Sequence, residues 1–310
     1  MPATGGLLTN RTVLLAKIES TYGTDPTPAT SANEVEVFDL SIKPVFERVE
    51  RKPLRASLSP LAMAKSKLLY EITFTTELKG SGTAGTAGRL SPLFQACGMT
   101  ETDNGTTSTI YTPGNPSGSC TLWVYKDGLI FKSQGCRGNF EIVAEAGKIA
   151  QVKWTFRGKY NIPVDGALVS PTYEATTGQV LESTTTQLSG FAAHTRSYSI
   201  DMGNNIVDRP SLNSSNAMVG VIIGSRNPQG KLLMEAELIA TEATWTEFDA
   251  DTVTSFTSTI GATAGNIVTI TASSKVQYAD ITPTDENGIF MYDIAMAFSG
   301  TDDEITITMT

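Results

Sequence analysis

A fifteen-residue stretch near the start of the chain returns in degraded form in the second half, and this repeat constrains the fold more than any other feature. Leu40–Leu54 reads LSIKPVFERVERKPL, and Tyr198–Leu212 reads YSIDMGNNIVDRPSL. Aligned without a gap, the two stretches share a Ser-Ile pair and a valine-acid-arginine triplet, both at an offset of 158 residues. Because this offset is close to half of the 310 residues, it predicts a tandem duplication of one structural unit.

Two further pairs of segments occur in the same order in both halves. Glu77-Leu78 ends the segment YEITFTTEL, and Glu237-Leu238 ends KLLMEAEL. Ile149–Gly158 matches Ile289–Gly300, and each segment follows a glycine-containing turn and contains Phe-x-Gly at its end. Chance resemblance between β-strands is the alternative, but the shared order favours two homologous halves.

Short alternating segments dominate the chain and predict a mainly β fold with one or two short helices. The one helix candidate is Arg89–Cys97, which Gly98 ends. Aspartate-glycine at 127–128 and alanine-glycine at 146–147 predict two hairpins in the first half. We expect a first β-sandwich domain at 1–165, a linker rich in Pro, Gly and Thr at 166–195, and a second domain at 196–310.

In the second half we expect a hairpin around Arg226–Gly230, a polar segment at 247–263 without a helix, and several further strands. The predicted strands of this half are 196–202, 218–224, 231–246, 267–272, 276–281, 289–299 and 304–309. The last of these alternates clearly and is expected to be an exposed edge, which invites pairing with another chain.

A long connection at 43–67 lacks a clean period of two or 3.6 residues and is expected to be without regular structure. Such a connection inside a compact domain usually has a function or is disordered. It combines many cations with apolar residues, so we expect a neighbouring subunit to bury it; an ordinary solvated loop is the alternative. The residues expected at this contact are Arg48, Arg51, Lys52, Arg55, Lys65, Lys67, Leu58 and Met63.

Charge is distributed unevenly between the halves. Residues 1–165 carry 18 Lys and Arg against 15 Asp and Glu, whereas residues 166–310 carry 5 against 17. Opposite potentials on two halves suit head-to-tail or ring contacts between copies, because they fix register and partner choice. Greater solvent exposure of one half explains the same distribution without contacts.

Known catalytic and binding patterns do not emerge from this sequence. The single histidine, His194, lies in a polar segment without a nucleophile elbow, and the acids near the C-terminus lack the spacing of a calcium loop. Gly80-x-Gly82-x-x-Gly85 matches a dinucleotide fingerprint literally, but a polar, turn-rich loop follows it in place of a second parallel strand. We therefore expect no enzyme, no cofactor and no metal. The three cysteines are expected to be reduced, and we expect no membrane anchor and no secretory signal.

The order of these segments resembles that of phage major tail tube proteins. The segments that carry the likeness are the opening at Glu34–Arg55, the strand with Tyr-Glu-Ile-Thr-Phe, the glycine-rich linker with its short helix, and the closing strand at Lys148–Tyr160. The likeness covers Leu7 to about Val164 and extends more weakly over 196–300. It implies tandem tail-tube-like sandwiches whose inner sheets join a β-barrel shared between subunits.

The resemblance also implies the partners and the location. Copies of the chain would form stacked rings, as a pseudo-hexameric trimer if both halves are tube domains and otherwise as a hexamer. The contact residues in the 43–67 connection would then lie between rings. Further partners would be the tape measure protein in the lumen, the tail terminator and the distal tail protein, with double-stranded DNA passing without specific binding. The protein would be assembled in the bacterial cytoplasm and reside in the virion tail.

Two other classes of function stay open from the residues alone. A β-rich virion module that binds a receptor or carbohydrate would show exposed aromatic side chains on one sheet face. An all-β hydrolase would need a pair of carboxylates in a cleft.

Overall fold

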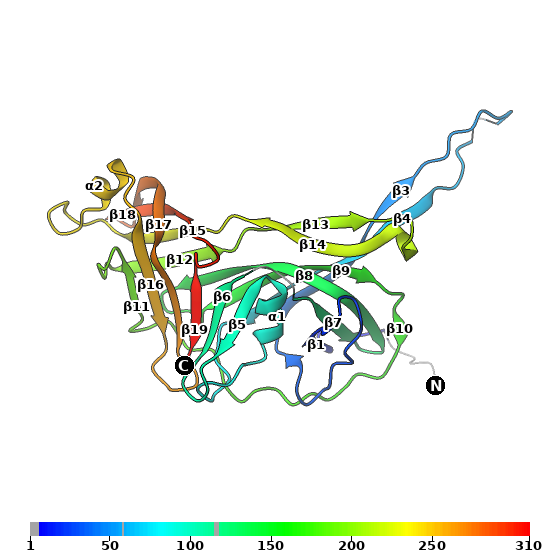
Figure 1. Ribbon diagram of the computed structural model, residues 1–310, viewed down its shortest axis with the longest axis horizontal. Helices are drawn as coiled ribbons and strands as arrows, with labels where there is room; N and C mark the ends of the chain where they lie inside the picture. The colour runs from blue at the N-terminus through cyan, green and yellow to red at the C-terminus, as the bar shows by residue number, and fades with distance from the viewer. Residues whose placement is uncertain (1–5, 58, 115–117) are drawn as a thin grey trace.

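The computed structural model describes residues 6–57, 59–114 and 118–310 (Figure 1). Over these residues the chain is mainly β with two short α-helices, which confirms the predicted fold class. The first half contains β1 (Thr12–Ile18), β2 (Glu34–Val35), β3 (Phe38–Val49), β4 (Ala64–Glu77), α1 (Ser91–Ala96), β5 (Met99–Asp103), β6 (Thr109–Pro113), β7 (Cys120–Lys126), β8 (Leu129–Glu145), β9 (Gln151–Tyr160) and β10 (Val164–Asp165). The second half contains β11 (Thr185–Leu188), β12 (Thr195–Asp201), β13 (Asn204–Pro210), the 3-10 turn η1 (Ser215–Ala217), β14 (Met218–Arg226), β15 (Gln229–Glu235), α2 (Thr244–Asp249), β16 (Thr254–Ile260), β17 (Val268–Glu286), β18 (Ile289–Phe298) and β19 (Thr306–Met309).

One antiparallel sheet runs through both halves in the order β3-β4-β9-β8-β12-β15-β18-β17. Its first four strands and its last four are connected alike, and the ladder between β8 and β12 joins the two sets. The rung that begins at Ile42 continues through Ile72, Phe156 and Gly138. The rung that begins at Ile200 continues through Gly230, Met296 and Tyr278. The offset of 158 residues therefore relates β3 to β12 and β4 to β15.

The strands β8 and β17 are long enough to bend out of this sheet into a second layer. The first part of β8 pairs with β7, which pairs with β1, and its opposite edge pairs with β10. The first part of β17 pairs with β16, which pairs with β11, and its opposite edge pairs with β19. The 166–195 segment thus supplies β11 in the place that β1 has in the first half. Within the described residues, the sheets do not close into a barrel.

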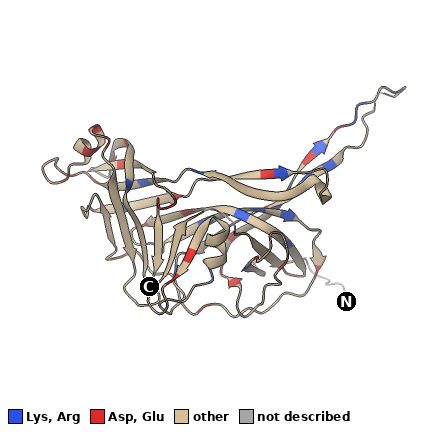
Figure 2. Ribbon diagram, in the orientation of Figure 1, with Lys and Arg blue, Asp and Glu red and all other residues tan. Residues whose placement is uncertain are grey.

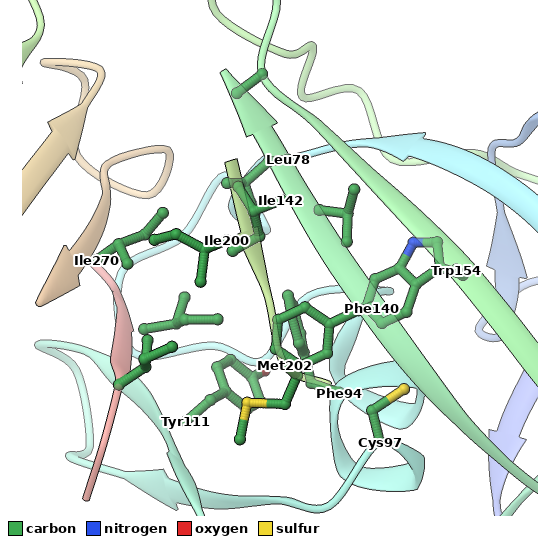
Figure 3. Close-up of a cluster of buried hydrophobic side chains, with 14 of the residues drawn as sticks. Leu78, Phe94, Cys97, Tyr111, Phe140, Ile142, Trp154, Ile200, Met202 and Ile270 are labelled. Atoms are coloured by element: carbon green, nitrogen blue, oxygen red, sulfur yellow. The ribbon is translucent and has the colours of Figure 1, made fainter. Parts of the chain in front are cut away.

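The hydrophobic core is continuous across the two halves. Ile200 of β12 and Met202, just after this strand, lie in one cluster with Phe140 of β8, Phe94 of α1 and Ile270 of β17 (Figure 3). At its centre Trp154 contacts Phe74, Phe94, Phe140 and Phe156, and its indole N–H donates to the hydroxyl of Thr76. All three cysteines are buried with free thiols, as the sequence predicts. Because both halves contribute to one core, the halves are held together by apolar burial as well as by the sheet.

Two hairpins of equivalent position differ in their surroundings. The hairpin β3–β4 projects from the body as a straight arm, whereas β13–β14 lies across β8 and β9 (Figure 1). The expected irregular connection at 43–67 is wrong at both ends, because β3 continues to Val49 and β4 begins at Ala64; the described residues between them have no regular structure, as expected. A ribbon with both faces in solvent has no buried face, so its residues need not alternate between apolar and polar.

Three expectations for the second half are corrected. The segments β14 and β15 do not pair with each other, because β14 pairs with β13 and β15 pairs with β12. The polar segment at 247–263 contains the end of α2 and the strand β16, whose alternate residues face the core. The terminal strand β19 is not an exposed edge, because it pairs with β17 on one side and with β6 on the other, and buries Ile307 and Met309.

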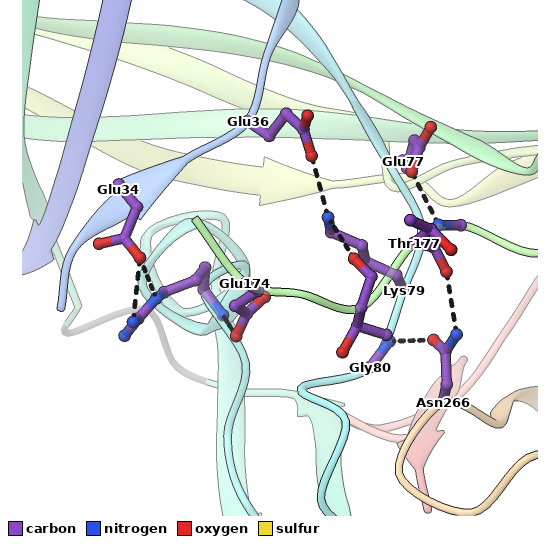
Figure 4. A network of polar contacts seen from close by, with 11 residues as sticks. Glu34, Glu36, Glu77, Lys79, Gly80, Glu174, Thr177 and Asn266 are labelled. Carbon is purple, nitrogen blue, oxygen red and sulfur yellow. Dashed lines mark hydrogen bonds and ion pairs between the residues drawn. The ribbon is translucent and has the colours of Figure 1, made fainter. Parts of the chain in front are cut away.

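A polar network fastens the 166–195 segment to the first half (Figure 4). Glu174 accepts the backbone N–H of Arg89, whose guanidinium also bonds buried Glu34. Lys79 donates to the carbonyl of Thr176, and Glu77 accepts the N–H of Gly178. The segment expected to be a linker is therefore hydrogen-bonded to the first half along part of its length. No helix among the described residues has the length and apolar character that crossing a membrane requires.

Candidate assembly interface

The ladder between β8 and β12 is an interface between two equivalent four-stranded units. Ser197–Asp201 lie opposite Glu141–Glu145. The N–H of Ala146 donates to the carbonyl of Arg196 over 2.9 Å, and the N–H of Met202 donates to the carbonyl of Phe140 over 3.1 Å. Backbone groups in an antiparallel strand alternate in direction. The even-numbered residues of β8 therefore direct their N–H and C=O groups at β12.

One side chain brackets the end of this ladder. The amide of Asn139 donates to the carboxylate of Asp201 over 2.6 Å and accepts the backbone N–H of Asn204 over 2.8 Å. Asn204 in turn donates to the carbonyls of Cys97 and Gly138. Asn139 thus fixes the point at which the chain leaves β12 and enters the β13–β14 hairpin.

Tyr22 and Arg137 of the first half hold the β13–β14 hairpin against the sheet. The hydroxyl of Tyr22 accepts the N–H of Val221 over 2.8 Å and donates to the carbonyl of the same residue over 3.1 Å. Arg137 lies over the Tyr22 ring and donates to the same carbonyl. A β-carbon on Gly220 would overlap the Tyr22 hydroxyl, so the backbone of the hairpin approaches as closely as a glycine allows. Leu69 packs with Met218 and Val221 beneath the hairpin.

Replacing Tyr22 with Phe is expected to lower the free energy of unfolding at pH 7 by about 1–3 kcal/mol, because the buried Val221 amide loses its partner. Burial raises the pKa of Tyr22 above its ordinary value of 10, so the folded chain keeps this proton to a higher pH than the unfolded chain. The stability from the protonated phenol is complete below pH 10 and is lost as the pH rises through the raised pKa. Urea unfolding between pH 7 and pH 11 should therefore show the difference between the two proteins shrinking above pH 10. A difference that stays constant with pH would contradict this role of the phenol.

The eight-stranded sheet ends in two open edges. Among the described residues, β3 pairs only with β4, and Asp280–Glu286 of β17 pair only with β18. Each edge carries a proline, Pro44 on β3 and Pro283 on β17. Proline lacks an N–H and is confined within sheets to edges and bulges, and it discourages uncontrolled pairing there. Both strands are therefore edge strands in the single chain, each unpaired on one side.

The structure places the predicted contact residues on the projecting arm, the β3–β4 hairpin together with its loop at 50–63. Arg48, Lys65 and Lys67 lie on the paired strands, where Arg48 and Lys65 flank the ring of Phe46 and Lys67 bonds Glu47. The loop carries Arg51, Lys52 and Arg55, and beside them the fully exposed Leu54. Met63 is exposed next to β4, and Leu58 lies outside the described residues. The arm is the blue-rich projection in Figure 2.

The arm and the β13–β14 hairpin correspond residue for residue in the sequence. The offset of 158 residues carries 45–69 onto 203–227 without a gap, and the rung Val49–Ala64 onto Val207–Ile222. In β13–β14 the ladder continues further, to Pro210 and Met218, whereas in the arm it ends at Val49 and Ala64. Because an isolated two-stranded ribbon is only marginally stable, the difference fits a hairpin that has a supporting sheet beneath it and one that has none.

Several interface residues could not be recognised from the sequence. Nothing in the sequence around Tyr22 or Asn139 marks their contacts, because these depend on which strands become neighbours. His194 is exposed, as expected, and lines an open cleft together with Arg196 and Glu286. Of the glycines in the Gly80-x-Gly82-x-x-Gly85 match, Gly80 and Gly82 bond Asn266 and Gly265 of the second half.

The comparisons with known proteins bear on this interface. A family model described as phage tail tube protein matches residues 9–310, nearly the whole chain. The match includes the arm, both four-stranded units and the ladder between them. The comparison with curated proteins gave no match.

Proposed function

The chain belongs to the phage tail tube protein family, and we propose that it polymerises into stacked rings that form the tube through which DNA is ejected into the host. Membership of this family makes it a structural protein of the virion tail. The observation that carries the proposal is the sheet of two equivalent units with an open strand at each end. A sheet of this kind uses up its edges when copies join head to tail and close into a barrel.

The proposed ring contains three chains. The β8–β12 ladder already joins two units within one chain, so three chains supply six units around the axis. We propose that 1–165 and 196–310 are the two tail-tube-like domains, with β11 of the 166–195 segment completing the second. A heterologous contact repeated by rotation gives a closed ring when the rotation divides the circle.

We propose that the arm supplies the contacts between chains. Its cations, Arg48, Arg51, Lys52, Arg55, Lys65 and Lys67, would meet the acidic second half of a copy in the adjacent ring. The exposed apolar residues of the arm, among them Leu54 and Met63, would be buried there. Opposite charges steer such an encounter and select the register.

The conduit role agrees with the charge of the chain. The net charge of −9 disfavours retention of DNA phosphates, so double-stranded DNA passes without specific binding. The tape measure protein would occupy the lumen during assembly in the bacterial cytoplasm, and the tail terminator and distal tail protein would bind the two ends of the tube.

Negative-stain microscopy and mass measurement of the purified chain test this proposal. We expect rings or tubes, and a smallest closed species with the mass of three 33.0 kDa chains. A closed species of six chains would retain the tube and replace the trimer by a hexamer. Discrete monomers at every concentration and salt would contradict the proposed function and favour the binding-module alternative.

A further inference from the structure

We infer that β3 of one chain pairs with β17 of a second copy in the register of the internal β12–β8 ladder. In this register Lys43 of the first chain lies opposite Thr282 of the second, and its side chain contacts Asp280 on the diagonal, as Asp201 contacts Asn139 inside the chain. The inference rests on the proposed ring and specifies its interface residue by residue. It commits the two open edges of the sheet to one occupant, another copy of this chain.

The register follows from the repeat of strand pairing. Rungs starting at Ile42 and Ile200 end at Gly138 and Tyr278, so β3 corresponds to β12 and β8 corresponds to β17. A bulge in β17 lies between Tyr278 and Asp280. Beyond it, the rung Asp280–Ala295 occupies the place of Asn139–Thr155, and Pro283–Tyr292 the place of Ile142–Val152.

Two contacting side chains at the end of the internal β12–β8 ladder are both replaced at the corresponding positions of the proposed β3–β17 ladder. Inside the chain, Asn139 bonds Asp201 over 2.6 Å. At the corresponding positions of the open edges, Asp280 replaces Asn139 and Lys43 replaces Asp201. An amide that donates to a carboxylate thus becomes a carboxylate that accepts from an ammonium, so the contact is conserved in geometry and gains opposite charges.

Both side chains are available for this contact. Lys43 bonds Glu71 within its own chain, yet its side chain is 63% exposed and keeps donors for a second acceptor. Asp280 is exposed and accepts the hydroxyl of Thr282 within the single chain, which leaves lone pairs on its carboxylate for further donors. By the same correspondence, Asp280 would also accept the backbone N–H of Phe46, as Asn139 accepts that of Asn204.

The prolines limit the strength of the proposed ladder. Pro283 stands where Ile142 directs its N–H at β12, and Pro44 stands where Met202 donates to Phe140. Each proline therefore removes one hydrogen bond that the internal ladder has. The interface between chains is expected to be weaker than the ladder within a chain and to depend more on the Lys43–Asp280 pair.

Disulfide trapping tests the register. Ser41 and Thr284 correspond to Ser199 and Val143, which face each other on a rung whose backbone groups point away from the partner strand. Cα atoms on such rungs lie about 4.5 Å apart, within disulfide range. Assembled Ser41→Cys/Thr284→Cys protein, oxidised with diamide, should give covalent oligomers that end at three chains on a non-reducing gel.

Two matched variants control this experiment. Ser199→Cys/Val143→Cys should form its disulfide within one chain and leave the mass unchanged. Ser41→Cys/Thr282→Cys is displaced by one rung pair, about 7–8 Å on the diagonal, and should cross-link far less. Equal cross-linking of the displaced pair, or none of the Ser41/Thr284 pair in assembled rings, would overturn the register.

A charge exchange tests the side-chain contact. Lys43→Asp and Asp280→Lys should each raise the concentration needed for assembly by at least about tenfold, because like charges then face each other. The double variant should recover assembly, because the pair is restored with its charges exchanged. The aspartate at position 43 lies beside Glu71 in both the single and the double variant. A defect caused only by that repulsion within the chain would therefore not be rescued. Single variants that assemble like wild type would overturn the inference and leave the ring intact. Failure of the wild-type chain to form rings would overturn the proposed function itself.

Discussion

Replacing residues 50–63 by Asn-Gly is expected to abolish tube formation while leaving the fold unchanged. Val49 and Ala64 already form the last rung of the arm, and Asn-Gly is the preferred two-residue turn between antiparallel strands. The removed residues include Leu54 and Met63, whose side chains lie in solvent in the single chain. Shortening an exposed loop removes no core contact and lowers the entropic cost of closing it, so the free energy of unfolding should not fall below that of wild type. The effect should therefore appear in microscopy and sedimentation and not in the unfolding curve.

A charge-only variant separates length from electrostatics. Changing Arg51, Lys52 and Arg55 to Gln keeps the loop and should weaken assembly most at low salt, where wild-type assembly gains most from attraction. Changing Lys148 and Lys153 to Gln removes cations that pair within their own sheet and should have little effect. Normal tubes from the shortened arm would contradict the role of the arm in contacts between chains.

Segments with a buried face were predictable from the sequence. The Leu68–Leu78 strand and the closing strand at 148–160 correspond to β4 and β9, whose alternate residues pack in the core. The Arg89–Cys97 helix corresponds to α1. Hairpins marked by Asp-Gly and Ala-Gly occur where expected, because those residues adopt the backbone conformations that tight turns require.

Segments without a buried face of their own were not predictable. The arm and β13–β14 are ribbons whose residues meet solvent or another sheet, so their periodicity carries little information. Asn227-Pro228 suggested a hairpin, but it connects β14, which pairs with β13, to β15, which pairs with β12. The strand β19 looked like an edge because one of its partners, β6, lies nearly 200 residues earlier in the chain.

Only the part of the candidate interface that has a distinctive composition was predictable. Clustered cations in a long connection are a compositional signal, and it located the arm. A pairing such as Lys43 with Asp280 depends on the order of strands in space. The equivalence of the two four-stranded units shows this order, because the β8–β12 ladder inside the chain supplies a register for the proposed pairing between chains.

Replacing Glu19 with Gln is expected to lower the free energy of unfolding by about 2–4 kcal/mol. Its carboxylate is buried and accepts four hydrogen bonds: from the hydroxyls of Ser119 and Thr121, and from the backbone N–H groups of Gly23 and Gly135. A glutamine has one acceptor oxygen, so donors on the other side would face its NH₂ group. Buried donors without an acceptor are costly, and the four cannot all move to water.

The position of Glu19 connects this loss to assembly. Gly135 lies against the ring of Tyr22, and Tyr22 holds Val221 of the β13–β14 hairpin. Loosening the carboxylate should therefore release the hairpin before the core, and hydrogen exchange at Val221 should accelerate more than at Trp154. The exposed Glu145→Gln change, which removes one surface ion pair with Lys148, should cost less than about 1 kcal/mol and serves as the control. An equal loss in both variants, measured by urea unfolding below the assembly concentration, would show that the four buried donors do not need the charge.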